Sequence, residues 1–134
     1  TAPNLAEPGK RMLSSMSPTF VEKDGELFMV TGSPGGRTII NTTLQTILNV
    51  VDHGMSAQAA VDAGRFHHQW LPDVIRYEAQ LFSPDTLAIL ESWGHTTDAT
   101  DGQGVAEVIV VNPDDGWLEG GVDRRPPDGG AIGY

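Results

Sequence analysis

The chain has 134 residues, the size of one average domain, and its 39% content of hydrophobic residues is enough to bury a core. The formal charge of −10 and the lack of a basic run argue against a nucleic-acid partner, and 16 Gly with 9 Pro argue against a helical bundle. Without Cys, the chain has no disulfide, thiolate nucleophile or Cys-ligated metal, and no apolar run approaches the roughly 18 residues of a membrane-spanning helix.

A β-hairpin is the first regular unit that the sequence predicts. Residues 1–13 contain two Pro, one Gly and no sustained period, so we expect an extended arm or the end of a loop there. The segments 20–23 and 26–30 then flank Asp24-Gly25, a dipeptide typical of two-residue hairpin turns. This turn would place Lys23 opposite Glu26.

A glycine-rich turn and a helix are predicted next. The turn is Gly32-Ser33-Pro34-Gly35-Gly36, and His53-Gly54 marks the end of the helix. The order strand, glycine turn, helix is therefore expected in this third of the chain. The apolar residues at helical spacing are Ile40, Leu44, Ile47, Leu48 and Val51.

Two further helices have clear start signals. Ser56 is typical of the N-cap of a short helix that ends at Gly64. Ser83 as N-cap and Pro84 at the first helical position predict another helix, which ends at Gly94. Its apolar face would carry Leu87, Leu90 and Trp93.

The remaining strands complete a mixed α+β class. Residues 66–78 predict two short strands split by Leu71-Pro72-Asp73, and residues 105–111 and 117–122 predict an antiparallel pair across a turn at 112–116. One domain, residues 1–134, accounts for all of these elements.

The glycine turn is the first candidate site. Consecutive glycines let several backbone N–H groups point the same way, and a helix N-terminus adds the positive end of its dipole, so Gly35 and Gly36 could hold a phosphate, a carboxylate or an oxyanion. Composition alone favours the alternative of a plain tight turn, because the run matches neither GxGxxG nor a Walker motif.

Hydroxyl side chains form a second candidate at Leu13–Thr19. Ser14 and Ser15 could hydrogen-bond a substrate carboxylate, with Lys10, Arg11 and Arg37 as nearby bases. Composition alone again favours the alternative, which is that these are turn and capping hydroxyls.

The histidines carry no metal site in this interpretation. His67 and His68 are adjacent in a predicted strand, so they would face opposite sides and could not both bind one metal ion. We interpret them as structural.

Several motifs, in one order, resemble the γ-glutamyltranspeptidase family. The resemblance runs from about Pro8 to Gly94, is looser through the final strands, and resumes at the end of the chain. The motifs that carry it are Gly9-Lys10-Arg11, Leu13-Ser14-Ser15-Met16-Ser17-Pro18-Thr19, Thr31-Gly32-Ser33-Pro34-Gly35-Gly36, Arg65-Phe66-His67-His68-Gln69-Trp70-Leu71-Pro72, Asp123-x-Arg125 and Gly133-Tyr134.

The resemblance implies an N-terminal-nucleophile hydrolase with a four-layer αββα sandwich, made as a precursor that cuts itself into a large and a small subunit. This chain resembles the C-terminal part of the small subunit. Its implied partners are the large subunit and the upstream part of the small subunit. The implied reaction is that of a γ-glutamyltransferase or glutathione hydrolase, which needs no metal or organic cofactor, and family habit suggests a periplasmic or secreted enzyme.

The resemblance also implies roles for four residues of this chain. Ser14 and Ser15 would bind the α-carboxylate of the γ-glutamyl group, and the backbone N–H groups of Gly35 and Gly36 would form the oxyanion hole. These roles reverse both interpretations drawn from composition alone.

Thr1 departs from the pattern of the family. The nucleophile there is the first Thr of the small subunit, on the order of seventy residues ahead of the Ser-Ser pair, whereas Thr1 lies thirteen residues before Ser14 and precedes Ala2-Pro3. We therefore expect the nucleophile to be absent from this chain, and the isolated chain to be inactive. The alternatives are a related amidase or acylase with another substrate, and a non-catalytic anion-binding fragment.

Overall fold

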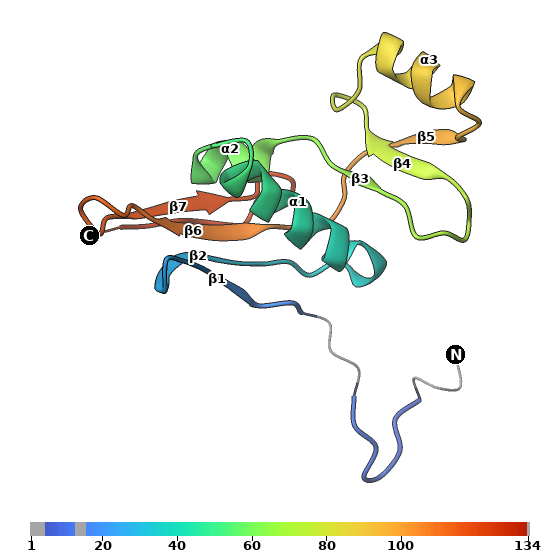
Figure 1. Ribbon diagram of the computed structural model, residues 1–134. Coiled ribbons are helices and arrows are strands. Elements are labelled where there is room, and N and C mark those ends of the chain that lie inside the picture. Colours follow the sequence, from blue (N-terminus) through green and yellow to red (C-terminus); the bar gives the residue numbers. More distant parts are fainter. Residues whose placement is uncertain (1–4, 13–15, 134) are drawn as a thin grey trace.

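In the computed structural model, residues 5–12 and 16–133 are described. They fold into two sheets and three α-helices in the order β1, β2, η2, α1, α2, β3, β4, α3, β5, β6, β7 (Figure 1). Residues 5–12 are exposed and run away from the sheets without regular structure, as the arm predicted for residues 1–13 would. None of the helices in the described ranges has the length and apolar character needed to cross a membrane.

The predicted hairpin is confirmed. Strands β1 (Thr19–Lys23) and β2 (Glu26–Gly32) pair antiparallel, and Lys23 lies opposite Glu26. The two turn residues have positive φ, 55° at Asp24 and 85° at Gly25, as the tight turn requires.

The predicted helices are also confirmed, and side-chain caps mark the starts of two of them, α2 and α3. After the 3-10 turn η2 (Gly36–Thr38), helix α1 spans Ile39–Val51. Helix α2 (Ala57–Asp62) begins where the Ser56 hydroxyl accepts a hydrogen bond from the Ala59 N–H. Helix α3 (Pro84–Ser92) begins in the same way at Ser83, which accepts from the Thr86 N–H. Each cap satisfies a backbone donor that the first helical turn leaves free.

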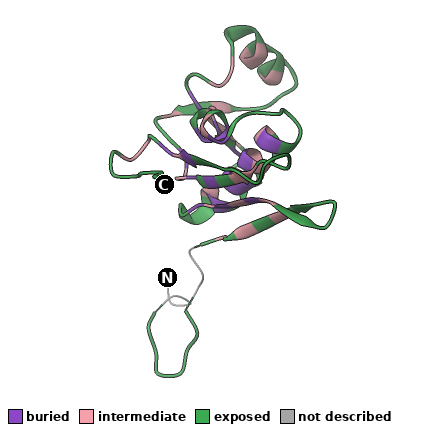
Figure 2. Cartoon of the chain, turned by 90° about the vertical axis from the view of Figure 1, so that its left-hand side faces the viewer, coloured by how far each residue is buried: buried purple, intermediate pink, exposed green. Residues whose placement is uncertain are grey.

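A four-stranded antiparallel sheet forms the larger part of the molecule. Strands β6 (Glu107–Val111) and β7 (Leu118–Val122) pair as predicted, and the strand order is β1-β2-β6-β7. Helices α1 and α2 cover one face of this sheet (Figure 1), and the buried residues gather between the two layers (Figure 2). The core consists of Met29, Val50, Ala57, Ala60, Val61, Ala106 and Val108.

The smaller sheet contains a strand that the sequence did not predict. Strands β3 (Phe66–His67) and β4 (Ile75–Glu78) are the two expected between the helices, and they pair antiparallel. Strand β5 (Thr97–Thr100) adds to β4 in parallel and was missed. Its sequence, TDAT, has no apolar alternation, so pairing with β4 rather than local pattern defines it.

Two apolar surfaces of the larger part lie uncovered. On α1 most residues at the predicted helical spacing face outward: Ile40 is 75% exposed and Leu44 52%. Ile47 is the exception, since it packs against the core, and Thr42 and Thr46 are buried. The sheet face opposite the helices borders a hollow of about 1010 Å³. The apolar side chains along this hollow are Val30, Ile109, Trp117, Leu118 and Ile132.

Helix α2 lies so close to β7 that one strand position has no room for a side chain. A Cβ at Gly121 would lie 2.4 Å from the Ala57 carbonyl oxygen. We therefore expect Gly121→Ala to destabilise the protein by about 1–3 kcal/mol, because α2 would have to move off the sheet. Urea denaturation would measure this loss. Gly130→Ala is the matched control, since a Cβ there meets nothing within 4 Å and its free energy of unfolding should stay unchanged.

Candidate functional site

The glycine turn lies at the edge of the larger sheet, between the end of β2 and the start of α1. Ser33 is buried, whereas Pro34, Gly35 and Gly36 are exposed. Gly35 has a φ of 138° and Gly36 a φ of 57°, values that L side chains rarely adopt. The carbonyl of Gly35 accepts hydrogen bonds from the N–H and the hydroxyl of Thr38, at 3.1 and 3.0 Å.

The backbone donors of this turn are available to a ligand. The N–H groups of Gly35 and Gly36 donate to no described residue outside the turn, and both glycines are exposed. The helical segment η2–α1 directs the positive end of its dipole toward them. The oxyanion role that the resemblance implies for these two residues stays a prediction.

The segment 103–106 packs against the glycine turn and supports it. Ser33 Oγ accepts a hydrogen bond from the Val105 N–H at 3.2 Å. A Cβ on Gly104 would lie 2.4 Å from Thr42 Oγ1, and one on Gly35 would lie 3.2 Å from Gly104 Cα. The two backbones are therefore in direct contact, and any displacement of residues 103–106 would reach the glycine turn.

Four charged residues hold this supporting segment at both ends. Glu78 accepts a hydrogen bond from the Gln103 N–H at 2.8 Å, and Asp123 accepts one from the Ala106 N–H at 2.8 Å. Arg65 Nη1 donates to the Gln103 carbonyl at 2.9 Å and forms an ion pair with Asp123 Oδ2 at 2.7 Å. Arg125 bridges the two carboxylates, with Nε 2.6 Å from Glu78 Oε1 and Nη1 3.0 Å from Asp123 Oδ1.

The network of two arginines and two carboxylates is largely buried, and each charge has a partner of opposite sign. The side chains of Arg65, Glu78 and Asp123 are at most 2% exposed. Desolvation tends to raise the pKa of Asp123, but the N–H groups of Ala106 and Arg125 and the Arg65 guanidinium outweigh it, so the pKa of Asp123 lies below its usual value. Desolvation is also the largest influence on Arg65, and it lowers the pKa of that guanidinium.

The lowered pKa of Asp123 predicts how stability depends on pH. A carboxyl with a depressed pKa contributes fully above its unfolded pKa of about 4, and the contribution is lost as the pH falls through the folded value. We expect the difference in unfolding free energy between wild type and Asp123→Asn to be largest at neutral pH and to shrink below about pH 4. Urea denaturation across this range would measure it. A difference that stayed constant would contradict the ionised state assigned to Asp123.

The Ser14-Ser15 pair falls outside the described residues, but the residues that follow it are placed. Ser17 Oγ lies 2.8 Å from Thr43 Oγ1 on α1, and a Cβ on Gly32 would lie 3.2 Å from the Ser17 carbonyl oxygen. Met16 and Ser17 border the same hollow as Ser33 and Pro34. Two residues after Ser15, the chain therefore runs beside the start of the glycine turn.

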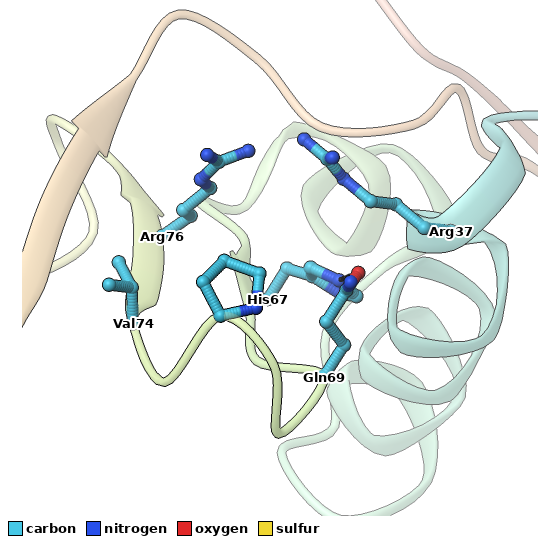
Figure 3. A pocket seen from close by; sticks show the side chains of 6 residues that line it. Arg37, His67, Gln69, Val74 and Arg76 are labelled. Carbon is cyan, nitrogen blue, oxygen red and sulfur yellow. Dashed lines mark hydrogen bonds between the residues drawn. The ribbon is translucent and has the colours of Figure 1, made fainter.

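A small pocket between η2 and the smaller sheet was not predicted. Arg37, His67, Gln69, Pro72, Val74 and Arg76 line it (Figure 3). His67 is 5% exposed and His68 lies outside the pocket, so the two adjacent histidines do have different surroundings, as expected. Sequence reasoning missed the pocket because Arg37 and Arg76 lie in different elements. It missed the ion network for the same reason, although Arg65 and Asp123-x-Arg125 belong to the motifs of the resemblance.

Comparisons with known proteins agree with that resemblance. The family described as Gamma-glutamyltranspeptidase matches residues 1–134. A glutathione hydrolase proenzyme of Escherichia coli K12 is 50% identical over 131 residues, which are 98% of this chain and 22% of that protein. A solved mutant γ-glutamyltranspeptidase of Helicobacter pylori is 43% identical with a TM-score of 0.83, over 90% of this chain and 66% of that one. The transpeptidase enzyme CapD of Bacillus anthracis is 25% identical with a TM-score of 0.79, over 98% and 78%.

These similarities confirm the α+β fold class and the N-terminal-nucleophile hydrolase architecture predicted from the sequence. The larger sheet and its cover of α1 and α2 are this chain's share of the layered sandwich. The chain spans about a fifth of the length of the curated relative from Escherichia coli.

Proposed function

Because the chain belongs to the γ-glutamyltranspeptidase family, we propose that it is the C-terminal portion of the small subunit of a γ-glutamyltransferase or glutathione hydrolase. The complete enzyme cleaves γ-glutamyl amide bonds, as in glutathione and its conjugates. The observation that carries the proposal is the exposed pair of N–H donors at Gly35 and Gly36, at the start of η2–α1.

In the proposed reaction, a Thr hydroxyl from the upstream part of the small subunit attacks the γ-glutamyl carbonyl, and its own α-amine takes the proton. The carbonyl oxygen becomes an oxyanion, and the N–H groups of Gly35 and Gly36 donate to it, each worth about 3–4 kcal/mol in the transition state. The amine leaves with a proton, and a γ-glutamyl ester remains on the Thr. Water or an amino acid then attacks this ester, and the same donors stabilise the second oxyanion.

Ser14 and Ser15 bind the α-carboxylate of the γ-glutamyl group in this proposal. Support comes from the placement of Ser17, which contacts α1 and the backbone of Gly32. That contact brings the chain next to the glycine turn, so a substrate could reach hydroxyl donors and oxyanion donors together.

The partners of the chain in this proposal are the large subunit and the upstream part of the small subunit. Both uncovered apolar surfaces, the outer stripe of α1 and the open face of the sheet, support such partners, because apolar areas of this extent are costly to leave in water. Because the reaction would need these parts, we expect the isolated chain to be inactive.

Two alternatives remain distinguishable from the proposal. A related amidase or acylase would use the same oxyanion donors on another substrate. The likeness to the transpeptidase CapD supports this alternative. A non-catalytic fragment would bind anions and turn over nothing.

The carboxylate role of Ser14 and Ser15 provides the test. In the complete enzyme we expect the double variant Ser14→Ala, Ser15→Ala to raise KM for γ-glutamyl-p-nitroanilide by 10-fold or more, because each hydroxyl bond to a charged carboxylate is worth about 1.5–3 kcal/mol. The release of p-nitroaniline measures it.

A γ-linked substrate without the α-carboxylate is the control for this prediction. Its turnover should be low in the wild type and should not fall further in the double variant. An equal loss on both substrates would contradict the carboxylate role. Turnover by the isolated 134-residue chain would contradict the assignment of the nucleophile to an upstream segment.

A further inference from the structure

A second group of anion-binding side chains lies next to the glycine turn. Arg37, which directly follows Gly36, extends from η2 toward the smaller sheet, and Arg76 extends from β4 toward η2 (Figure 3). Their guanidinium groups point toward one another above His67 and Gln69. Two like charges that face each other repel unless an anion lies between them.

Unsatisfied hydrogen-bonding groups mark the same place. Across residues 5–12 and 16–133, two buried side-chain nitrogens have no hydrogen-bond partner, His67 Nδ1 and Arg76 Nε. Both belong to residues that line this pocket. The carboxylate nearest to Arg76 Nε is Asp98, at 3.6 Å, which is too long for a hydrogen bond. Buried polar atoms are nearly always paired, so these two nitrogens indicate that polar partners are missing at this pocket.

The orientation of Gln69 determines what His67 offers to that partner. The Gln69 amide N–H donates to the Leu71 carbonyl at 2.8 Å, so its oxygen faces His67 Nε2, also at 2.8 Å. His67 Nε2 therefore carries a hydrogen. Nδ1 is the ring nitrogen left without a partner, and it can accept a hydrogen bond inside the pocket.

The arginines retain most of their charge for a ligand. The Arg37 guanidinium makes no hydrogen bond or ion pair with the described residues. The ion pair of Arg76 is a long one, 3.6 Å from Nε to Asp98 Oδ2, and Asp98 is 59% exposed. A partly solvated pair of this length neutralises little of the guanidinium charge.

From these contacts we infer that Arg37 and Arg76 form a carboxylate-binding site, lined by His67 and distinct from Ser14 and Ser15. The cavity of about 10 Å³ has room for one water molecule, which can donate a hydrogen bond to His67 Nδ1. The carboxylate would lie at the mouth of the cavity, between the two guanidinium groups. A guanidinium on each side is the usual protein partner of such a group.

The position next to the oxyanion donors indicates where the carboxylate comes from. Resting on the proposed function, the inference is that the group leaving the γ-glutamyl carbonyl, such as the cysteinylglycine part of glutathione, presents its terminal carboxylate to this site. The same chemistry could instead come from an Asp or Glu side chain elsewhere in the complete enzyme. The experiment separates these two sources.

The test compares glutathione with its C-terminal amide in the complete enzyme. Both have the same γ-glutamyl group, but only glutathione ends in a carboxylate. We expect Arg37→Gln or Arg76→Gln to raise KM for glutathione by about 10-fold with kcat unchanged, and to leave KM for the amide as it was. Arg124→Gln is the matched control, since Arg124 is 73% exposed and far along the chain from the pocket residues.

The other outcomes are also decisive. Both arginine variants could instead lower the melting temperature and affect the two substrates equally. The carboxylate bound at the site would then be an Asp or Glu side chain of the complete enzyme, not the substrate. If neither KM nor melting temperature changes, the pocket holds only water and the inference is wrong. A wild-type enzyme that hydrolyses neither substrate would overturn the proposed function, while the melting temperatures would still test the site.

Discussion

Replacing Gly35 with Ala in the complete enzyme should lower kcat by about 100-fold, the cost of one displaced oxyanion donor. Its φ of 138° lies where an L side chain is strained, and the new Cβ would lie 2.7 Å from Thr38 Oγ1 and 3.2 Å from the Gly104 Cα. The turn must therefore shift, and its N–H groups shift with it. Steady-state kinetics on γ-glutamyl-p-nitroanilide, with thermal melting as a check on folding, would measure the effect.

Gly36→Ala is the matched control, because a Cβ at Gly36 meets nothing within 4 Å. Its φ of 57° is the left-handed value that Ala adopts at a cost of about 1–2 kcal/mol, so the N–H can stay in place and kcat should fall much less. Gly36→Pro is not a suitable variant, because the proline ring fixes φ near −65°, whereas Gly36 has a φ of 57°. If Gly35→Ala and Gly36→Ala were both well folded and had equal kcat, the exact backbone geometry of the turn would not matter for catalysis.

Removing the Arg65 guanidinium should produce the largest loss of stability. Arg65→Met keeps much of the side-chain volume but removes the guanidinium that pairs with Asp123 Oδ2 and donates to the Gln103 carbonyl. Asp123 would keep only Arg125 as a charged partner. Breaking a buried ion pair in this way costs about 3–5 kcal/mol. Urea denaturation of the complete enzyme would measure the change in the free energy of unfolding.

An exposed arginine provides the comparison for that loss. Arg124 is 73% exposed and lies 3.7 Å from Asp62, so Arg124→Met should change the unfolding free energy by less than about 1 kcal/mol. Similar losses for Arg65→Met and Arg124→Met would show that the buried network contributes no more than a surface pair.

Local chemistry explains which parts of the fold could be predicted. Asp24-Gly25 fixes a hairpin by its backbone angles, and Ser56 and Ser83 fix helix starts by hydrogen bonds within one turn. These signals need only neighbouring residues. They locate an element, but they do not specify which of its faces is buried.

Long-range contacts explain what could not be predicted. Strand β5 exists because it pairs with β4, and no apolar alternation marks it in the sequence. The ion network joins residues 47 positions apart at Glu78 and Arg125. At Gly35 and Gly36 the physical signal was present but ambiguous, and the resemblance to a family, not composition, indicated an oxyanion role.

The pairing of β2 with β6 has a consequence for folding kinetics. Thr31 Oγ1 donates to the Glu107 carbonyl across 76 positions of sequence, so the two central strands meet only after the whole segment between them has closed into a loop. Contacts of such high separation form slowly, because the entropy of loop closure must be overcome first. The glycine turn follows β2 and its support, residues 103–106, precedes β6. The slowest step of sheet formation is therefore also the step that brings the glycine turn against the segment that supports it.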